Sequence, residues 1–380
     1  MADVAAAVQD GRMVATSPRD AAGSRSATIE RRLRSHRLSA PAATIAEAGR
    51  HMLATQGQEF WGGRWALAAR TRGTPRLSDV DAALDRGELV RSWTMRGTIH
   101  VIPPEDLGWV LSLTGERQIR GAAAVHRREG IDDAEAALAE VAARSALAGG
   151  GRLTRAELFA VWEAAGVSTA KQRGYHLLTR LSMRLVLCQG PVVPREAGPS
   201  REQYFVLVDD WIGEHRAPAD PLAEFFVRFT ASHGPVGARD FAWWSGLPLG
   251  VARSAAAAAS DRLVIVDDQP EPQYVTTDAA PRRSATPSVV ALPPFEEYYL
   301  SYADRTVPCA PEFLAAVGPS MNGIVRPILV ARGQVVGVWT HSVAVGRHAD
   351  DPVPELFAPG AASDADVAAA LDRYRTFITG

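Results

Sequence analysis

The sequence predicts an α+β protein built from three tandem winged helix-turn-helix units and a small C-terminal β-barrel. Two observations lead to this fold class. The order of several short helices followed by a β-hairpin occurs three times up to about residue 278, as expected for a repeated structural unit. Beyond residues 278–287 the pattern changes to short strands separated by glycine, with one helix at the end.

The composition is that of a water-soluble globular protein. The chain has 380 residues, of which 47% are hydrophobic and 22% charged, and it lacks the apolar run of about 18 residues that would span a membrane. Cys188 and Cys309 are the only cysteines and no histidine has ligand spacing, so we expect no metal and no cofactor. The first residues lack the apolar segment of a secretory signal, so residues 1–28 are predicted to be a disordered tail and the location cytoplasmic.

Positive charge is carried almost entirely by arginine, because Lys171 is the only lysine. Arginine is in excess over acidic residues between positions 30 and 128, although the formal net charge of the whole chain is -2. A guanidinium suits bidentate phosphate contacts, so this distribution is compatible with nucleic-acid binding. A GC-rich genome would encode the same residues, and the charge alone does not separate the two explanations.

The first unit covers residues 29–128. Apolar residues at helical spacing predict helices over residues 41–55 and 60–69, and Ser78 with the acidic residues after it predicts a helix that stops at Gly87. Strands are predicted at residues 89–93 and 98–102, where β-branched and aromatic side chains cluster. Three helices and a hairpin are the elements of a winged helix-turn-helix.

The segment Gln56-Gly57-Gln58 separates the first two predicted helices. Residues two apart do not share a face of a helix, but they can converge where a helix ends and the chain extends. Gly57 permits such a break. Taken alone, the two glutamines are better explained as the polar end of a helix than as a catalytic site.

The second unit covers residues 129–215 and the third covers residues 216–278. A capping box formed by Thr154 and Glu157 predicts the start of a helix in the second unit. Other helices are predicted at residues 132–147, 169–185, 222–232, 239–244 and 248–260. Strands are predicted at residues 185–188, 204–208, 263–266 and 274–276, with an exposed wing loop at 190–201.

The C-terminal region covers residues 279–380. Strands are predicted at residues 289–292, 324–330, 335–339 and 342–345, and a final helix at residues 364–377. Arg332-Gly333-Gln334 has the composition of a hairpin turn. These strands predict a small β-barrel closed by the helix.

Several strings resemble the bacterial winged-helix DNA glycosylases of the AlkZ/YcaQ group. They are ATQGQ at 54–58, RGTIH at 96–100, HGP at 233–235 with RDFAWWSG at 239–246, LPPFEEY at 292–298 with DR at 304–305, and GVW at 337–339 after Gly333. The likeness runs from about residue 30 to the C-terminus. It implies a monomer in which the three units and the barrel form a C-shaped body around double-stranded DNA, in a nucleoid-associated location.

The resemblance also implies an activity. Members of this group are monofunctional DNA glycosylases that hydrolyse the N-glycosidic bond of N7-alkylated purines and unhook interstrand crosslinks, in some cases for self-resistance to a DNA-alkylating natural product. The catalytic motif of the group is glutamine, an apolar residue, then glutamine or aspartate, and it maps onto Gln56, Gly57 and Gln58. Glycine replaces the apolar residue, and Glu296 stands where the group more often has aspartate.

Glutamine is a reasonable catalytic residue only for such a substrate. An amide is not a useful general base, but an N7-alkylated purine is already cationic and leaves without protonation. The enzyme then has to place a water beneath C1′ and stabilise an oxocarbenium-like sugar, which oriented amides can do. Glu59 follows the motif, either as a base that points inward or as a solvated acid in the first turn of the next helix.

Five more residues are candidates for DNA binding: Arg64, Arg70, Arg91, Arg96 and His100. Arg64 and Arg70 flank the helix after the motif, where they would line a DNA channel or remain ordinary surface residues. Arg91, Arg96 and His100 lie in the first predicted wing and would approach phosphates. The alternation around His100 equally suits a half-buried hairpin in which this ring is structural.

The alternative function is a winged-helix DNA-binding protein without catalysis, such as a transcriptional regulator. The moderate net charge disfavours it. So does the presence of three units in one chain, because regulators of this kind usually bind as symmetric dimers.

Overall fold

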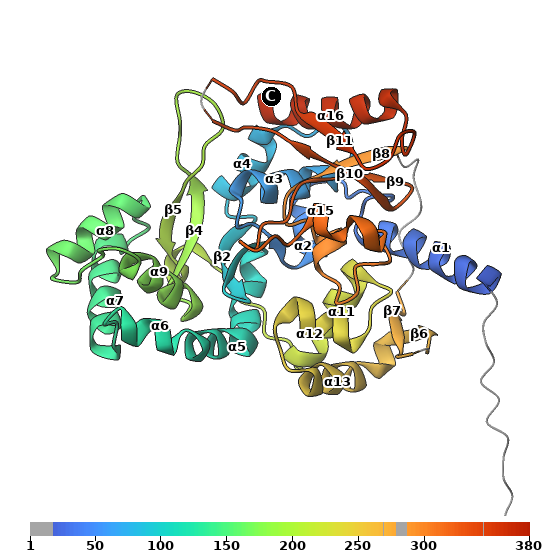
Figure 1. Cartoon of the computed structure of the whole chain (residues 1–380). Coiled ribbons are helices and arrows are strands. Elements are labelled where there is room, and N and C mark those ends of the chain that lie inside the picture. The colour runs from blue at the N-terminus through green and yellow to red at the C-terminus, as the bar shows by residue number, and fades with distance from the viewer. Residues whose placement is uncertain (1–17, 269, 279–286, 345) are drawn as a thin grey trace, which may run out of the picture.

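The computed structural model describes residues 18–268, 270–278, 287–344 and 346–380. Helices and strands are mixed along the chain, and the strands form antiparallel sheets of five, four and two strands (Figure 1). Within these ranges no helix combines the length and the apolar character needed to cross a membrane.

The first part of the chain follows the predicted order of helices and a hairpin. Its elements are α1 (Pro18–Ser35), α2 (Ile45–Met52), β1 (Thr55–Gln56), α3 (Phe60–Ala69), α4 (Leu77–Asp85), β2 (Val90–Met95) and β3 (Thr98–Ile102). Thr44 caps α2 by accepting a hydrogen bond from Glu47 N at 3.1 Å. The structure places residues 18–28 in helix α1, where a disordered tail was expected, and residues 1–17 lie outside the described residues.

The second part forms a lobe that is visible on the left of Figure 1. Its elements are α5 (Pro104–Gly121), α6 (Ala123–Arg128), α7 (Asp133–Leu147), α8 (Arg155–Ala164), α9 (Arg173–Met183), β4 (Leu187–Val192), β5 (Gln203–Leu207) and α10 (Val208–Trp211). The predicted capping box is present, because Thr154 Oγ1 accepts from Glu157 N at 3.3 Å while Glu157 Oε2 accepts from Thr154 N at 2.8 Å. Within this part, the long hairpin of β4 and β5 lies between helices α7–α9 and the rest of the molecule (Figure 1).

The third part contains the remaining predicted hairpin. Its elements are α11 (Pro221–His233), α12 (Ala238–Ser245), α13 (Leu249–Ala258), η1 (Ser260–Arg262), β6 (Leu263–Asp267) and β7 (Gln273–Thr276). Strands β6 and β7 pair only with each other among the named strands of the described chain. The first two hairpins differ from this one, since they join in a single sheet of order β1-β3-β2-β4-β5 through the pair Arg91 and Gln189.

The predicted C-terminal β-barrel is wrong, because the described strands form an open four-stranded sheet of order β11-β10-β9-β8. The elements are β8 (Val289–Leu292), α14 (Glu297–Leu300), η2 (Pro311–Phe313), α15 (Leu314–Val317), β9 (Ile328–Ala331), β10 (Gln334–Thr340), β11 (Val353–Leu356) and α16 (Asp364–Thr379). A strand was predicted at residues 342–345, but residues 342–344 are not in a strand, and Val345 lies outside the described residues. The predicted turn is present, with positive φ at Arg332 and Gly333.

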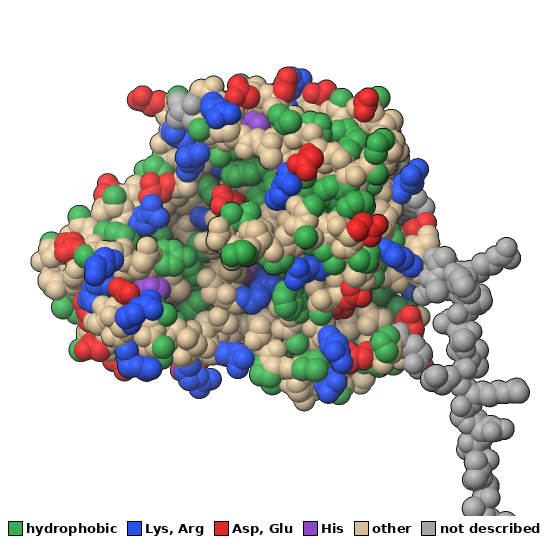
Figure 2. Space-filling view, in the orientation of Figure 1, with side chains coloured by type: hydrophobic (Ala, Val, Ile, Leu, Met, Phe, Trp, Pro, Cys, Tyr) green, Lys and Arg blue, Asp and Glu red, His purple; other side chains and the backbone are tan. Residues whose placement is uncertain are grey.

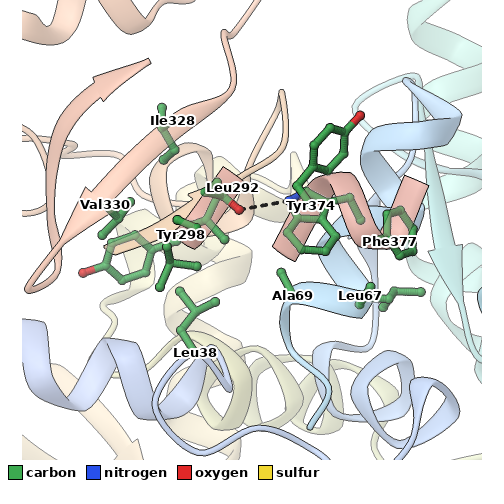
Figure 3. Close-up of a cluster of buried hydrophobic side chains, with 14 of the residues drawn as sticks. Leu38, Leu67, Ala69, Leu292, Tyr298, Ile328, Val330, Tyr374 and Phe377 are labelled. Carbon is green, nitrogen blue, oxygen red and sulfur yellow. Dashed lines mark hydrogen bonds between the residues drawn. The ribbon is translucent and has the colours of Figure 1, made fainter. Parts of the chain in front are cut away.

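A covering helix makes closure of the sheet unnecessary. Tyr374 and Phe377 of α16 pack in one hydrophobic cluster with Leu292 and Ile328 of the sheet and with Leu67 of α3 (Figure 3). Because the apolar face is already buried, the strands gain nothing by curling into a barrel. The same cluster fixes α3, the helix that follows the two glutamines.

Candidate active site

Gln56 ends the short edge strand β1, and Gln58 lies two residues further on, in the bend before α3. Helix α2 stops at Met52, and Leu53 turns the chain with a φ of 62°. Strand β1 then pairs with β3, so that Gln56 stands opposite His100, and Gly57 N donates to Ile99 O at 2.8 Å. Both glutamines are held against β3, Gln56 by strand pairing and Gln58 by the hydrogen bond that its Oε1 accepts from Ile99 N.

Helix α3 packs directly on the backbone of this strand at Gly63. A β-carbon at Gly63 would lie 3.0 Å from Gly57 Cα and 3.2 Å from Gln56 O. At Gly57 itself a β-carbon would lie 3.3 Å from Val101 Cγ2 and 3.5 Å from Arg91 Nε. Gly57 is not among the residues with positive φ, so it is close packing that favours a small residue here.

Backbone N–H groups orient both glutamine amides. Gln56 is 6% exposed, and its Oε1 accepts from Gln58 N at 3.2 Å. Gln58 is exposed, and its Oε1 accepts from Ile99 N at 3.2 Å. A backbone N–H only donates, so each amide must turn its oxygen toward it and its NH₂ group away. The carbonyl oxygens each retain a second lone pair.

Arg91 holds the backbone of the motif from the neighbouring strand. Its Nε donates to Gly57 O at 2.7 Å and its Nη2 to Gln58 O at 3.3 Å, while Nη1 donates to Gln189 Oε1 at 2.6 Å. Burial, and then the charge of Arg64, lower the pKa of Arg91 to about 9, so it remains charged at neutral pH. Arg91 was expected to contact DNA. It is only 7% exposed, however, and its donors bond to protein groups.

Arg64 and Arg70 are also buried. Arg64 donates to both carboxylate oxygens of Asp81, at 2.8 and 3.0 Å, and to Ser200 O at 2.6 Å. Arg70 forms an ion pair with Glu296 and donates to Ala66 O at 3.0 Å. These contacts join α3 to α4, to the β4–β5 loop and to the segment before α14. Both arginines therefore hold elements of the protein together. They were expected to line a DNA channel.

Arg96 and His100 lie in the β2–β3 hairpin and differ in exposure. Arg96 is partly buried at the β2–β3 turn with a φ of 54°, and burial lowers its pKa while Glu297 opposes the shift. His100 is fully buried, and its Nδ1 hydrogen-bonds to Thr94 Oγ1 at 2.9 Å. Burial lowers the pKa of His100 to about 4, so the ring is neutral at pH 7. Of the five arginine and histidine candidates, Arg96 has the most open position.

Glu297 is a site residue that sequence reasoning missed. Its Oε1 accepts from Gln56 N at 2.7 Å and its Oε2 accepts from Trp244 Nε1 at 3.1 Å. Burial raises the pKa of Glu297, but His233, whose Nε2 lies 3.6 Å away, together with His100 and Arg96 lowers it to about 2. An ionised carboxylate therefore stands directly behind Gln56.

A cleft of about 540 Å³ opens beside the motif. Gln58 and Glu59 line it, and so do the hydrogen-bonded pair Arg91 and Gln189. Its aromatic walls are Phe60, Trp61, Trp93, Tyr175 and Phe205. Figure 2 shows the surface hollowed between the lobe of α7–α9 and the upper part of the molecule. Polar groups and aromatic rings that converge in one cleft are typical of a ligand site.

Comparison with known proteins gives this site its context. The solved structure of the Streptomyces sahachiroi DNA glycosylase AlkZ has a similar fold, with a TM-score of 0.71 and 22% sequence identity, over 92% of this chain and 97% of that chain. An interstrand DNA cross-link repair glycosylase of Streptomyces sahachiroi is 27% identical over 298 residues, which cover 72% of this chain and 77% of the relative. A family model described as DNA glycosylase AlkZ-like matches residues 50–377.

Together these findings define a DNA glycosylase, a hydrolase of N-glycosyl bonds whose substrate is DNA. The family match includes both glutamines, the cleft and the C-terminal sheet. The chain belongs to the AlkZ-like DNA glycosylase family. The resemblance read from the sequence is confirmed, and the non-catalytic regulator loses its support.

Proposed function

We propose that this glycosylase hydrolyses the N-glycosidic bond of N7-alkylated purines in duplex DNA, including bulky adducts and interstrand crosslinks. The name of the relative, an interstrand DNA cross-link repair glycosylase, supports the substrate class. The observation that carries the proposal is the orientation of Gln56 and Gln58 by backbone N–H groups. Fixed amides of this kind can hold a water, but they supply no strong base.

Because the amides supply no strong base, the base must leave before or as the water attacks. In an N7-alkylated purine the C1′–N9 bond breaks with its electron pair moving to the ring, which neutralises the ring cation. A water held by Gln56 and Gln58 then forms the new bond to C1′, and its proton passes to solvent or to Glu59 at the mouth of the cleft. The ionised Glu297 behind Gln56 favours the positive charge that develops on the sugar.

The enzyme acts without an amine nucleophile from a lysine. Lys171 is the only lysine of the chain, it is exposed before α9, and it does not line the cleft. A covalent imine to the sugar would need such an amine. This agrees with a monofunctional glycosylase, whose products are the free base and an intact abasic strand.

In this proposal the protein acts as a cytoplasmic, nucleoid-associated monomer, and its three winged-helix units form a C-shaped body around the duplex. Arg96, with Gln58 and Glu59, would face the DNA. Resistance of the producer to its own DNA-alkylating product is the biological role that this substrate class suggests. Raised survival of a sensitive host that expresses the chain, under an alkylating natural product, would support this role.

The direct test uses duplex DNA with a single N7-alkylguanine and a second duplex with a defined N7 crosslink. Release of the modified base, and strand cleavage only after alkali, are expected from both. Unmodified duplex is the control. No release from either modified substrate would contradict the proposed activity.

A further inference from the structure

Three arginines from separate segments of the chain meet along α12. At the end of this helix, a β-carbon at Gly246 would lie 3.2 Å from Arg96 Cγ, and Gly246 O accepts from Arg117 Nε at 3.1 Å. One turn of helix earlier, Trp243 lies under Arg305, whose guanidinium carbon is 5.1 Å from the ring centroid. The three arginines and Trp243 are called the α12 face below.

The arginines of the α12 face lack acidic partners. Among the described residues, none of the three forms an ion pair with a carboxylate, whereas Arg64 and Arg70 are both ion-paired. Arg117 is exposed, and Arg96 and Arg305 are partly exposed. Guanidinium groups gathered on one surface repel one another, and a bound anion would remove that cost.

Trp243 orients Arg305 and cannot itself donate to a ligand. The indole is 43% exposed, but its Nε1 donates to Leu300 O at 2.8 Å, so only the ring face is open to Arg305. The same guanidinium carbon lies 5.6 Å from the ring centroid of Tyr299. An arginine that lies on aromatic rings can still donate, in its own plane, to the oxygens of a phosphate.

The α12 face is joined to the glutamine motif by α14, a single turn of helix. At one end of α14, Leu300 O holds the indole of Trp243, and at the other Glu297 Oε1 accepts from Gln56 N at 2.7 Å. Arg96 lies at the turn between β2 and β3, and β3 pairs with the strand that carries Gln56. A duplex bound across the α12 face would therefore pass close to this strand.

We propose that the α12 face binds the sugar-phosphate backbone of the duplex beside the reacting sugar. Its arginines donate to phosphate oxygens, and Trp243 is a positioning residue that acts through Arg305. The inference rests on the proposed function, which places the reacting sugar at Gln56. Contacts of this kind are independent of base sequence and depend on salt, because each one releases counterions from the DNA.

The test measures the affinity of the whole protein for unmodified duplex DNA at several salt concentrations, by fluorescence anisotropy. Arg305→Gln should weaken binding about tenfold and should lower the slope of log Kd against log salt by about one. Arg239→Gln is the matched control, because Arg239 is an exposed arginine of the same helix that forms an ion pair with Glu271. It should keep the wild-type affinity and slope.

A double variant tests the role of Trp243. Trp243→Leu should weaken binding about threefold, but the variant that combines it with Arg305→Gln should bind as Arg305→Gln does alone, because the indole acts through the guanidinium. Additive losses would contradict this positioning role, since a merely structural effect lowers the affinity in both backgrounds.

An unchanged affinity and slope in Arg305→Gln, or an equal loss in Arg239→Gln, would overturn the proposal. If Arg305→Gln does not fold, Arg117→Gln on the exposed surface of α5 should lower the slope by the same amount. A wild-type protein that releases no N7-methylguanine, while Arg305→Gln lowers the slope, would contradict the proposed function alone. Excision by the wild type with an unchanged slope in the variant would contradict the α12 face alone.

Discussion

The first and third hairpins of this protein have the same local pattern and different surroundings. The β2–β3 hairpin is buried along almost its whole length and is joined on one side to β1 and on the other to β4. The β6–β7 hairpin pairs with no other named strand of the described chain, and it exposes 45% of Val264 and 55% of Ile265. A repeated order of elements therefore does not imply a repeated role.

The difference lies in the number of long-range contacts. The first hairpin pairs with the strand that carries Gln56, and its Arg91 bonds to Gln189. Changes in this hairpin should therefore affect both stability and excision. The third hairpin should tolerate change. Five predictions test this contrast, from the largest expected effect to the smallest.

Replacement of both glutamines by alanine should abolish excision while the fold is kept. Each amide oxygen accepts a single backbone hydrogen bond, but the two amides place the attacking water, so we expect a loss of at least about 100-fold in the single-turnover rate. The rate on duplex with one N7-methylguanine measures this, with the circular dichroism spectrum as the control for folding. Excision at the wild-type rate would remove these residues from the mechanism.

Arg91→Leu should destabilise the protein and also slow excision. The change leaves Gly57 O, Gln58 O and Gln189 Oε1 without their donor, at a cost of about 2–4 kcal/mol in the free energy of unfolding. Urea unfolding measures the loss. Arg239→Leu is the matched control, because that arginine is exposed near the third hairpin and forms an ion pair with Glu271. Equal losses in the two variants would contradict the contrast.

Acid should destabilise the protein in part through His100 of the first hairpin. The folded protein holds His100 neutral with a pKa of about 4, whereas the ring has a pKa near 6.5 in the unfolded chain. Its contribution is therefore present above pH 6.5 and is lost as the pH falls toward 4, by about 3 kcal/mol. His100→Phe should show a shallower fall in the free energy of unfolding between pH 7 and pH 4. A fall as steep as in the wild type would argue against a neutral buried ring.

Gly63→Ala should do more harm than Gly57→Ala. The added carbon at Gly63 meets backbone atoms at 3.0 and 3.2 Å, so α3 has to move away from the motif, at a cost of about 1–3 kcal/mol. At Gly57 the added carbon meets a valine methyl at 3.3 Å, which can shift. Thermal unfolding and the excision rate of both variants decide the order. The reverse order would show that α3 does not set the position of the motif.

Val264→Lys together with Ile265→Lys should have the smallest effect. Both side chains are already largely exposed, so we expect a change within about 0.5 kcal/mol in the free energy of unfolding. Excision of a small adduct should be unchanged. A large loss of stability would show that this hairpin is covered in solution.

Local signals in the sequence predicted the helices and hairpins well. The capping box at Thr154 and the helix at residues 60–69 appear as predicted, because both depend on neighbours within one turn of chain. The hairpin turn at Arg332 and Gly333 is local in the same sense. Long helices such as α5 went without a prediction, since the apolar residues of α5 serve two different neighbours and give a weak periodicity.

The site was only half predictable. Gln56 and Gln58 were found through resemblance. Their positions depend on contacts with β3, more than 40 residues later: Gln56 pairs with His100, and Gln58 Oε1 accepts from Ile99 N. Glu297 bonds to Gln56 across 241 residues of sequence, and no pattern near either residue signals that contact. Burial of Arg64, Arg70 and Arg91 was missed for the same reason: an arginine in a sequence looks exposed until its acceptors are known.

The sheet shared by the first two hairpins joins two regions that were expected to be separate units. The boundary expected between residues 128 and 129 would cut a single hydrogen-bonded sheet and leave β2 with an open edge and Arg91 without Gln189. Residues 29–128 are therefore not expected to fold as an excised module, and the two units should melt in one cooperative transition.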